Sequence, residues 1–96
     1  MNLDARLDLH GMTQTEAYRA LRNFLETASY RGHRSVLIIT GKGARGFEGS
    51  GVLKHVVPLW LNEPKFRSRI LSFSFARPKH GGDGALYVLL KRKITS

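Results

Sequence analysis

The stretch SVLIITGKGARGFEGSGVL, residues 35–53, joins a strand to a helix through a glycine-rich loop. Residues 35–40 form a continuous, largely β-branched run, which is typical of a strand that is covered on at least one face. Glycine recurs through residues 41–51, where the chain leaves this strand. Ser50 is suited to cap the helix that follows. Helical spacing predicts that the apolar stripe of this helix consists of Leu53, Val56, Val57 and Trp60.

The segment before this stretch has the pattern of another strand and another helix. Apolar and polar side chains alternate over residues 3–10, so we expect a half-buried strand with Leu3 and Leu7 on the same side. Residues 13–16, TQTE, have the spacing of a capping box, which predicts a helix start. Gly32 is placed to end that helix.

The segment after the second helix predicts two more strands. They span residues 70–75 and 85–90 and are separated by the turn GGDG at residues 81–84. The predicted order is βαβαββ, and helices that connect strands imply parallel crossovers. The first three strands should therefore run in one direction and the fourth should return antiparallel. We predict an α/β fold, a two-layer sandwich with a mixed, mostly parallel four-stranded sheet.

The composition indicates a small and strongly basic domain. A length of 96 residues suits one domain, which we place at residues 1–96 with frayed termini at 1–4 and 93–96. Lys and Arg number 16 against 7 Asp and Glu, which gives a formal net charge of +9. A small domain of this charge favours a polyanionic partner, and nucleic acid is preferred over an acidic membrane surface.

Other protein classes leave signals that are missing from this sequence. Its apolar runs are far shorter than the roughly 18 residues of a membrane-spanning helix. Its first residues, MNLDARLDL, include no apolar leader segment. The absence of cysteine excludes disulfides and thiolate chemistry. We expect a cytoplasmic monomer that does not bind membranes.

The predicted topology brings three polar segments to one edge of the sheet. The carboxyl ends of its parallel strands are residues 8–11, 40–43 and 76–84, and open α/β sheets bind ligands at such ends. Backbone N–H groups of a glycine loop can point at an anion, and the next helix adds a positive dipole end. With Lys42 and Arg45 supplying charge, we interpret the loop as a phosphate cradle. The residues GKGARG also match a dinucleotide-binding fingerprint, but they follow the second strand of a chain too short for that fold, so we reject it.

Three motifs resemble those of a known family, the small MutS-related (Smr) domain. Residues 8–17, DLHGMTQTEA, resemble the start of that domain. The second motif is similar to ITGKG at residues 39–43, and the third to HGGDGALYV at residues 80–88. The motifs occur in the family's order, and the resemblance extends over about residues 7–91.

The resemblance implies a fold like the C-terminal domain of bacterial translation initiation factor three. It also implies endonuclease activity on nucleic acid, since DNA nicking and mRNA cleavage at stalled ribosomes are both attributed to family members. Such members often carry an N-terminal extension, so this chain is either a fragment or a stand-alone domain. Its glycine-rich second loop lacks the histidine of the compact GxGxH turn that other members have.

The residues at the predicted edge suit phosphodiester cleavage. Asp8 and His10 are two positions apart on a strand and share a face, so the carboxylate can orient the imidazole and raise its basicity. His10 could then act as acid or base, with the amides of Gly41 and Gly43 and the charge of Lys42 on the phosphate. RNA supplies its own 2′-hydroxyl nucleophile, whereas on DNA the attacking group must be water, and Mg²⁺ would help to activate it. We therefore expect RNA cleavage that requires no metal, and we predict no metal ligands.

The predicted catalytic residues are Asp8, His10 and Lys42. The predicted nucleic-acid contacts are Gly11, Gly41, Gly43, Arg45, Phe47, Arg77, Lys79, His80, Gly81 and Gly82. Phe47 is the preferred aromatic for stacking on a base. The remaining cations, at residues 31, 34, 67, 69 and 91–93, should lie at the opposite edge and add only to the general field.

Simpler roles stay open for each catalytic candidate. Asp8 could cap the adjacent turn, His10 could be structural, and Lys42 could be an ordinary exposed lysine. The chain could also be a non-catalytic module that binds nucleic acid or the ribosome, or an enzyme acting on a small phosphate compound.

Overall fold

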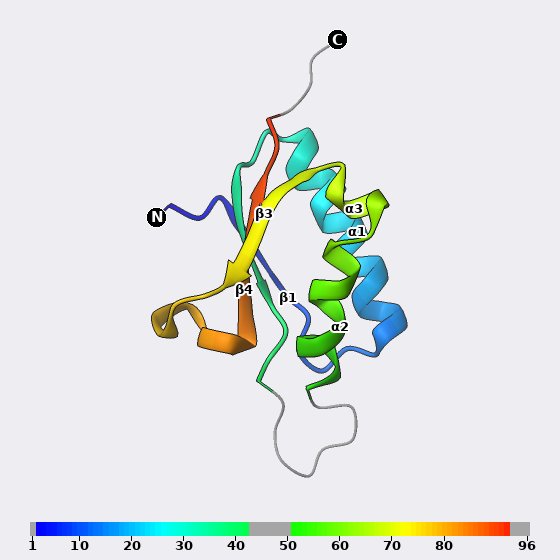
Figure 1. Cartoon of the computed structure of the whole chain (residues 1–96), viewed down its shortest axis with the longest axis vertical. Coiled ribbons are helices and arrows are strands. Elements are labelled where there is room, and N and C mark those ends of the chain that lie inside the picture. Colours follow the sequence, from blue (N-terminus) through cyan, green and yellow to red (C-terminus); the bar gives the residue numbers. More distant parts are fainter. Residues whose placement is uncertain (1, 43–50, 93–96) are drawn as a thin grey trace.

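The computed structural model describes residues 2–42 and 51–92, and Figure 1 shows how their helices and strands are arranged. The elements are β1 (Ala5–Asp8), α1 (Gln14–Tyr30), β2 (Ser35–Ile39), α2 (Val52–Leu61), α3 (Pro64–Arg67), β3 (Ile70–Phe75), two 3₁₀ turns η1 (Pro78–His80) and η2 (Gly82–Gly84), and β4 (Ala85–Leu90). The predicted βαβαββ order is confirmed. The sequence analysis missed α3, which begins where Pro64 occupies the first turn of a new helix.

The four strands form one mixed sheet in the order β1-β2-β4-β3. β1 pairs parallel with β2, and β4 pairs antiparallel with both β2 and β3. The first three strands therefore run in the same direction, as predicted. Because β4 inserts between β2 and β3, two of the three pairings are antiparallel. The expectation of a mostly parallel sheet is thus correct for the directions of the strands, three of which run the same way. It is not correct for the pairs of hydrogen-bonded neighbours, most of which are antiparallel.

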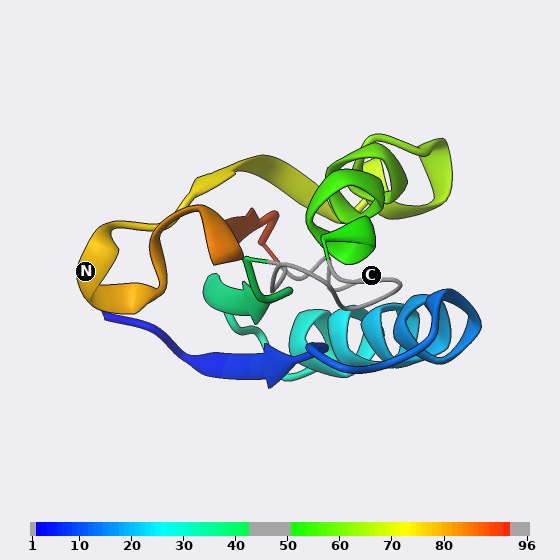
Figure 2. The same ribbon diagram turned by 90° about the horizontal axis from the view of Figure 1, so that it is seen from below.

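Both long helices cover the same face of the sheet, which Figure 2 shows from below. The main core lies between the layers, where Leu21 of α1 and Val57 of α2 are fully buried against sheet residues such as Ile38. A smaller cluster around Leu37 lies on the other face, which the helices do not cover. Leu3 packs against this second cluster, so its expected place on the side of Leu7 is wrong. It precedes β1 and is not held to the alternation of that strand.

The start of α1 is fixed by the predicted capping box. The backbone N–H of Glu16 donates to Thr13 Oγ1 at 3.1 Å, and the N–H of Thr13 donates to Glu16 Oε1 at 2.9 Å. These bonds satisfy two N–H groups at the helix start. The helix therefore begins a few residues after β1, which keeps the intervening segment at the carboxyl edge of the sheet. Ser50, the predicted cap of α2, lies outside the described residues, and Gly51 occupies the N-cap position.

None of the helices within residues 2–42 and 51–92 combines the length and the apolar character that crossing a membrane requires.

Candidate functional site

Backbone hydrogen bonds join three segments at the carboxyl edge of β1 and β2. The N–H of Leu9 donates to the carbonyl of Ile39 at 2.7 Å. The N–H groups of Thr40 and Gly41 both donate to the carbonyl of Gly84 at 2.9 Å. The turns that follow β1 and β2 and the turn that precedes β4 therefore lie side by side, as the topology predicted.

The space around two glycines shows how closely His10 and Lys42 approach these three turns. A Cβ atom on Gly41 would lie 3.3 Å from the Cβ of His10. A Cβ atom on Gly84 would lie 2.8 Å from the Cγ of Lys42 and 3.0 Å from its backbone nitrogen. His10 and Lys42 thus occupy the same edge of the sheet.

The predicted contact between Asp8 and His10 is confirmed. The Oδ1 atom of Asp8 lies 2.6 Å from His10 Nδ1 and accepts the His10 backbone N–H at 3.0 Å. Partial burial raises the pKa of Asp8, but the hydrogen bonds from the His10 ring and backbone outweigh it and lower that pKa overall. An ionised carboxylate at Nδ1 leaves Nε2 as the nitrogen that can exchange a proton with a ligand. Both side chains are accessible, at 49% exposed for Asp8 and 70% for His10.

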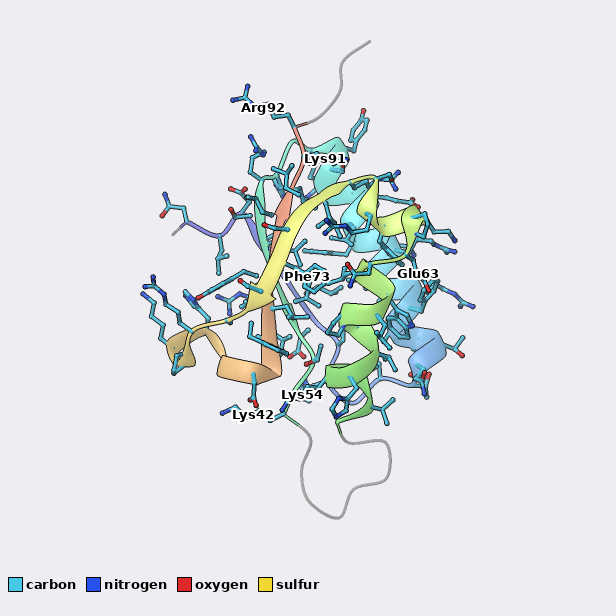
Figure 3. The ribbon with its side chains drawn as sticks, viewed as in Figure 1. Lys42, Lys54, Glu63, Phe73, Lys91 and Arg92 are labelled. Carbon is cyan, nitrogen blue, oxygen red and sulfur yellow. The ribbon has the colours of Figure 1, made fainter. Side chains whose placement is uncertain are left out.

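Lys42 belongs to a small charged cluster that the sequence analysis missed in part. Lys54, on the first turn of α2, donates from Nζ to Asp83 Oδ2 at 2.7 Å. The hydrogen bond from Lys54 and the charge of nearby Lys42 lower the pKa of Asp83. Figure 3 shows Lys42 and Lys54 at the same end of the molecule. Lys54 lies just after the glycine-rich loop, and this position in the sequence could have identified it as a residue of the candidate site.

The predicted cradle of free glycine-loop amides is wrong for Gly41, while Gly43 lies outside the described residues. The amides of Gly81 and Gly82, two other predicted contact residues, are also bonded within the protein. The N–H of Gly41 donates to Gly84, that of Gly81 to the carbonyl of Pro78 at 3.1 Å, and that of Gly82 to the carbonyl of Arg77 at 3.0 Å. These donors are satisfied within the protein and do not face a ligand. Gly84 instead provides room, since a Cβ there would lie 2.8 Å from Lys42 Cγ.

His80 lies in the third motif but is bonded to the sheet. Its Nδ1 shares a hydrogen bond with the hydroxyl of Tyr87, and the two rings pack edge to face with centroids 5.5 Å apart. Tyr87 also accepts the backbone N–H of Arg77 at 3.3 Å. Within the described residues, no hydrogen bond joins His80 to Asp8 or His10. Tyr87 therefore orders this turn, and no sequence motif pointed to that role.

The other predicted residues divide into three groups. Gly11 follows His10 with a φ of 81°. Arg77 and Lys79 are exposed on the segment between β3 and β4. Gly43, Arg45 and Phe47 lie outside the described residues.

A surface pocket lined by Gln14, Thr15, Tyr18, Arg19 and Arg22 lies on α1 and includes none of the predicted site residues. No group of three or more potential metal ligands was found in the part of the chain that the structure describes.

Comparison with known proteins gives consistent matches. The family model of the Smr domain matches residues 7–91. The ribosome rescue factor SmrB of Tolumonas auensis is 32% identical over 91 residues, which are 95% of this chain and 47% of that protein. The endonuclease MutS2 of Carboxydothermus hydrogenoformans is 37% identical over 90 residues, which are 94% of this chain and 10% of that protein.

A solved structure shares the fold. The crystal structure of the Smr domain of Thermus thermophilus MutS2 superposes with a TM-score of 0.76 at 31% identity, covering 91% of this chain and 98% of that one. This chain spans about half or less of the length of the two curated relatives. Since the family match covers most of the sequence, the chain belongs to the Smr domain family.

Proposed function

We propose that this Smr domain is a nucleic-acid endonuclease that prefers RNA and acts at the carboxyl edge of its sheet. The observation that carries the proposal is the Asp8–His10 pair, bonded at 2.6 Å on the edge that Lys42 shares. Further support comes from the net charge of +9 and from a relative named as an endonuclease.

In this proposal His10 is the proton-transferring group and Asp8 orients it. His10 Nε2 takes the proton of a ribose 2′-hydroxyl while the 2′-oxygen forms a bond to phosphorus. The bond from phosphorus to the 5′-oxygen of the next nucleotide breaks, and solvent protonates that oxygen. The products are a 2′,3′-cyclic phosphate and a 5′-hydroxyl, so no metal ion is needed to supply a nucleophile.

Lys42 is assigned to the phosphate, where charge accumulates in the transition state. Its side chain passes Gly84 and Gly82, and Arg77 and Lys79 add exposed positive charge to the same edge. Lys54 is already paired with Asp83, so we assign it no direct contact with the phosphate.

The test uses single-stranded RNA and DNA of the same sequence, each with Mg²⁺ and with EDTA. We expect RNA cleavage in EDTA, cyclic-phosphate ends, and at least about a 10²-fold slower reaction for His10→Ala. Glu26→Gln, an exposed carboxylate on α1, is the matched control for Asp8→Asn. Wild-type cleavage rates in folded Asp8→Asn and His10→Ala proteins would refute the assignment.

The second candidate is a non-catalytic module that binds nucleic acid or the ribosome through the same edge. One observation favours it, the similarity to a protein named as a ribosome rescue factor. This candidate predicts binding that weakens steeply with salt and releases no cleaved product.

A further inference from the structure

A second group of cations lies at the end of the sheet opposite the candidate site. Figure 3 shows Lys91 and Arg92 at the far end of the molecule from Lys42 and Lys54. We call this group the distal basic patch, and it consists of Arg31, Arg34, Arg67, Arg69, Lys91 and Arg92. These residues follow α1 and α3 and flank the amino ends of β2 and β3 and the carboxyl end of β4.

Backbone bonds hold the centre of the distal basic patch together. The N–H of Leu90 donates to the carbonyl of Arg34 at 2.7 Å, and the N–H of Lys91 donates to the carbonyl of Arg69 at 2.8 Å. The Nε of Arg34 also donates to the carbonyl of Leu90 at 3.0 Å. Three strand ends therefore place their cations side by side on a rigid support.

Carboxylates compensate little of this charge. Asp4 is the acidic group at this end, and its Oδ2 accepts the backbone N–H groups of Arg34 at 2.7 Å and Ser35 at 3.1 Å. These two hydrogen bonds lower the pKa of Asp4 and keep it ionised. Within the described residues, ion pairs made by Lys or Arg are limited to Lys54–Asp83 at the other end. Within the part of the chain that the structure describes, none of the six cations of the distal basic patch is held in an ion pair.

We propose that the distal basic patch is a second phosphate-binding surface, which holds the nucleic-acid backbone several nucleotides away from the candidate site. The assignment of the other end to cleavage rests on the proposed function, whereas binding at this end does not. Clustered cations repel one another unless an anion neutralises them, and a polyanion that spans the domain does this at both ends.

The length of β4 determines how long a nucleic-acid strand must be to contact both ends of the sheet. Five residue steps separate Ala85 from Leu90, and at about 3.4 Å each they span about 17 Å. A nucleic-acid strand in helical geometry advances about 3.4 Å per nucleotide, so in that geometry contact with both ends needs about six nucleotides, which are five steps apart. Its path crosses the face that the helices leave open, where Arg6, Ser72 and Ser74 are exposed.

The test compares RNAs of 4 and 16 nucleotides by fluorescence anisotropy over a range of salt concentrations. The variant is Lys91→Gln/Arg92→Gln, since both side chains are exposed and the changes should leave the fold intact. The charge-matched control is Arg19→Gln/Arg22→Gln on α1, and thermal melts verify folding of both.

Loss of two phosphate contacts should reduce the salt slope for the 16-mer by about 1.4, from about 0.7 for each contact to a single strand. At 0.1 M salt this corresponds to about 25-fold weaker binding. Binding of the 4-mer and the control variant should stay near wild type.

The proposal is overturned if the 16-mer keeps its salt slope, if the 4-mer loses as much affinity as the 16-mer, or if the control variant weakens equally. Loss of binding to vesicles of anionic lipid without loss for the 16-mer would overturn it as well. Absence of RNA cleavage by the wild-type protein would refute the proposed function alone, because the binding series does not depend on turnover.

Discussion

Replacement of Gly84 by alanine tests the geometry on which the candidate site depends. Gly84 does not have a positive φ, so its backbone conformation suits any residue. The added Cβ would instead meet three atoms, Lys42 Cγ at 2.8 Å and Lys42 N and Gly41 C at 3.0 Å. Favourable carbon contacts are about 3.5–4.0 Å. Two of these three atoms belong to the backbone and cannot rotate away, so the turn itself must shift.

We expect Gly84→Ala to lower the free energy of unfolding by about 1–3 kcal/mol, the usual range for overpacking. The shift also strains the hydrogen bonds that Thr40 and Gly41 donate to the Gly84 carbonyl, each worth about 0.5–1.5 kcal/mol. Urea denaturation followed by circular dichroism measures the stability. The affinity for a short RNA, measured on protein that remains folded, reports on the position of Lys42.

Gly32→Ala is the matched control. Its Cβ would meet nothing within 4 Å, but its φ of 77° makes alanine strained, at about 1–2 kcal/mol. It should lose stability without losing affinity, whereas Gly84→Ala should lose both. If Gly84→Ala is within about 0.5 kcal/mol of the wild type and binds RNA normally, the close approach of Lys42 to this turn is refuted.

Three further changes probe other contacts. Thr13→Ala removes half of the capping box and should lower the free energy of unfolding by about 1 kcal/mol in a urea titration; an unchanged midpoint would contradict the cap. Asp8→Asn should lower stability at neutral pH, because the folded-state pKa of Asp8 is lowered and its contribution is present above the unfolded pKa. The difference from wild type should disappear as pH falls through that folded pKa, and a pH-independent difference would exclude the hydrogen bonds from His10 as its source. Asp83→Asn should remove a negative charge and release Lys54 from its ion pair, so RNA binding should tighten in an anisotropy titration; weaker binding would show that the Lys54–Asp83 pair is needed to form the site.

Local patterns predict the elements of this fold better than its long-range contacts. Alternation and capping residues correctly identified β1 and the start of α1, and the spacing of Asp8 and His10 predicted their contact. The same alternation over residues 70–75 gives no sign of the register shift between Ile70 and Ser72, because pairing with another strand decides it.

Contacts across the site were the least predictable part. Lys54 and Asp83 are 29 residues apart. The topology predicts that the helix start and the turn share an edge, but nothing in either local sequence indicates that these two side chains pair. The prediction of a free amide at Gly41 was wrong for a related reason. The glycine content indicates a backbone without side chains. It does not indicate that the Gly41 amide donates to the carbonyl of Gly84, which is distant in the sequence.

The carbonyl of Gly84 also fixes the backbone that leads into Lys42. The Gly84 oxygen receives the N–H groups of residues 40 and 41 and the Thr40 hydroxyl, so the lysine that follows is anchored before the glycine-rich segment begins. Insertions or deletions in residues 43–50 should then leave its ammonium in place, since loop length alters closure entropy only slowly. Changes in the length of that segment should therefore leave the proposed phosphate contact of Lys42 intact.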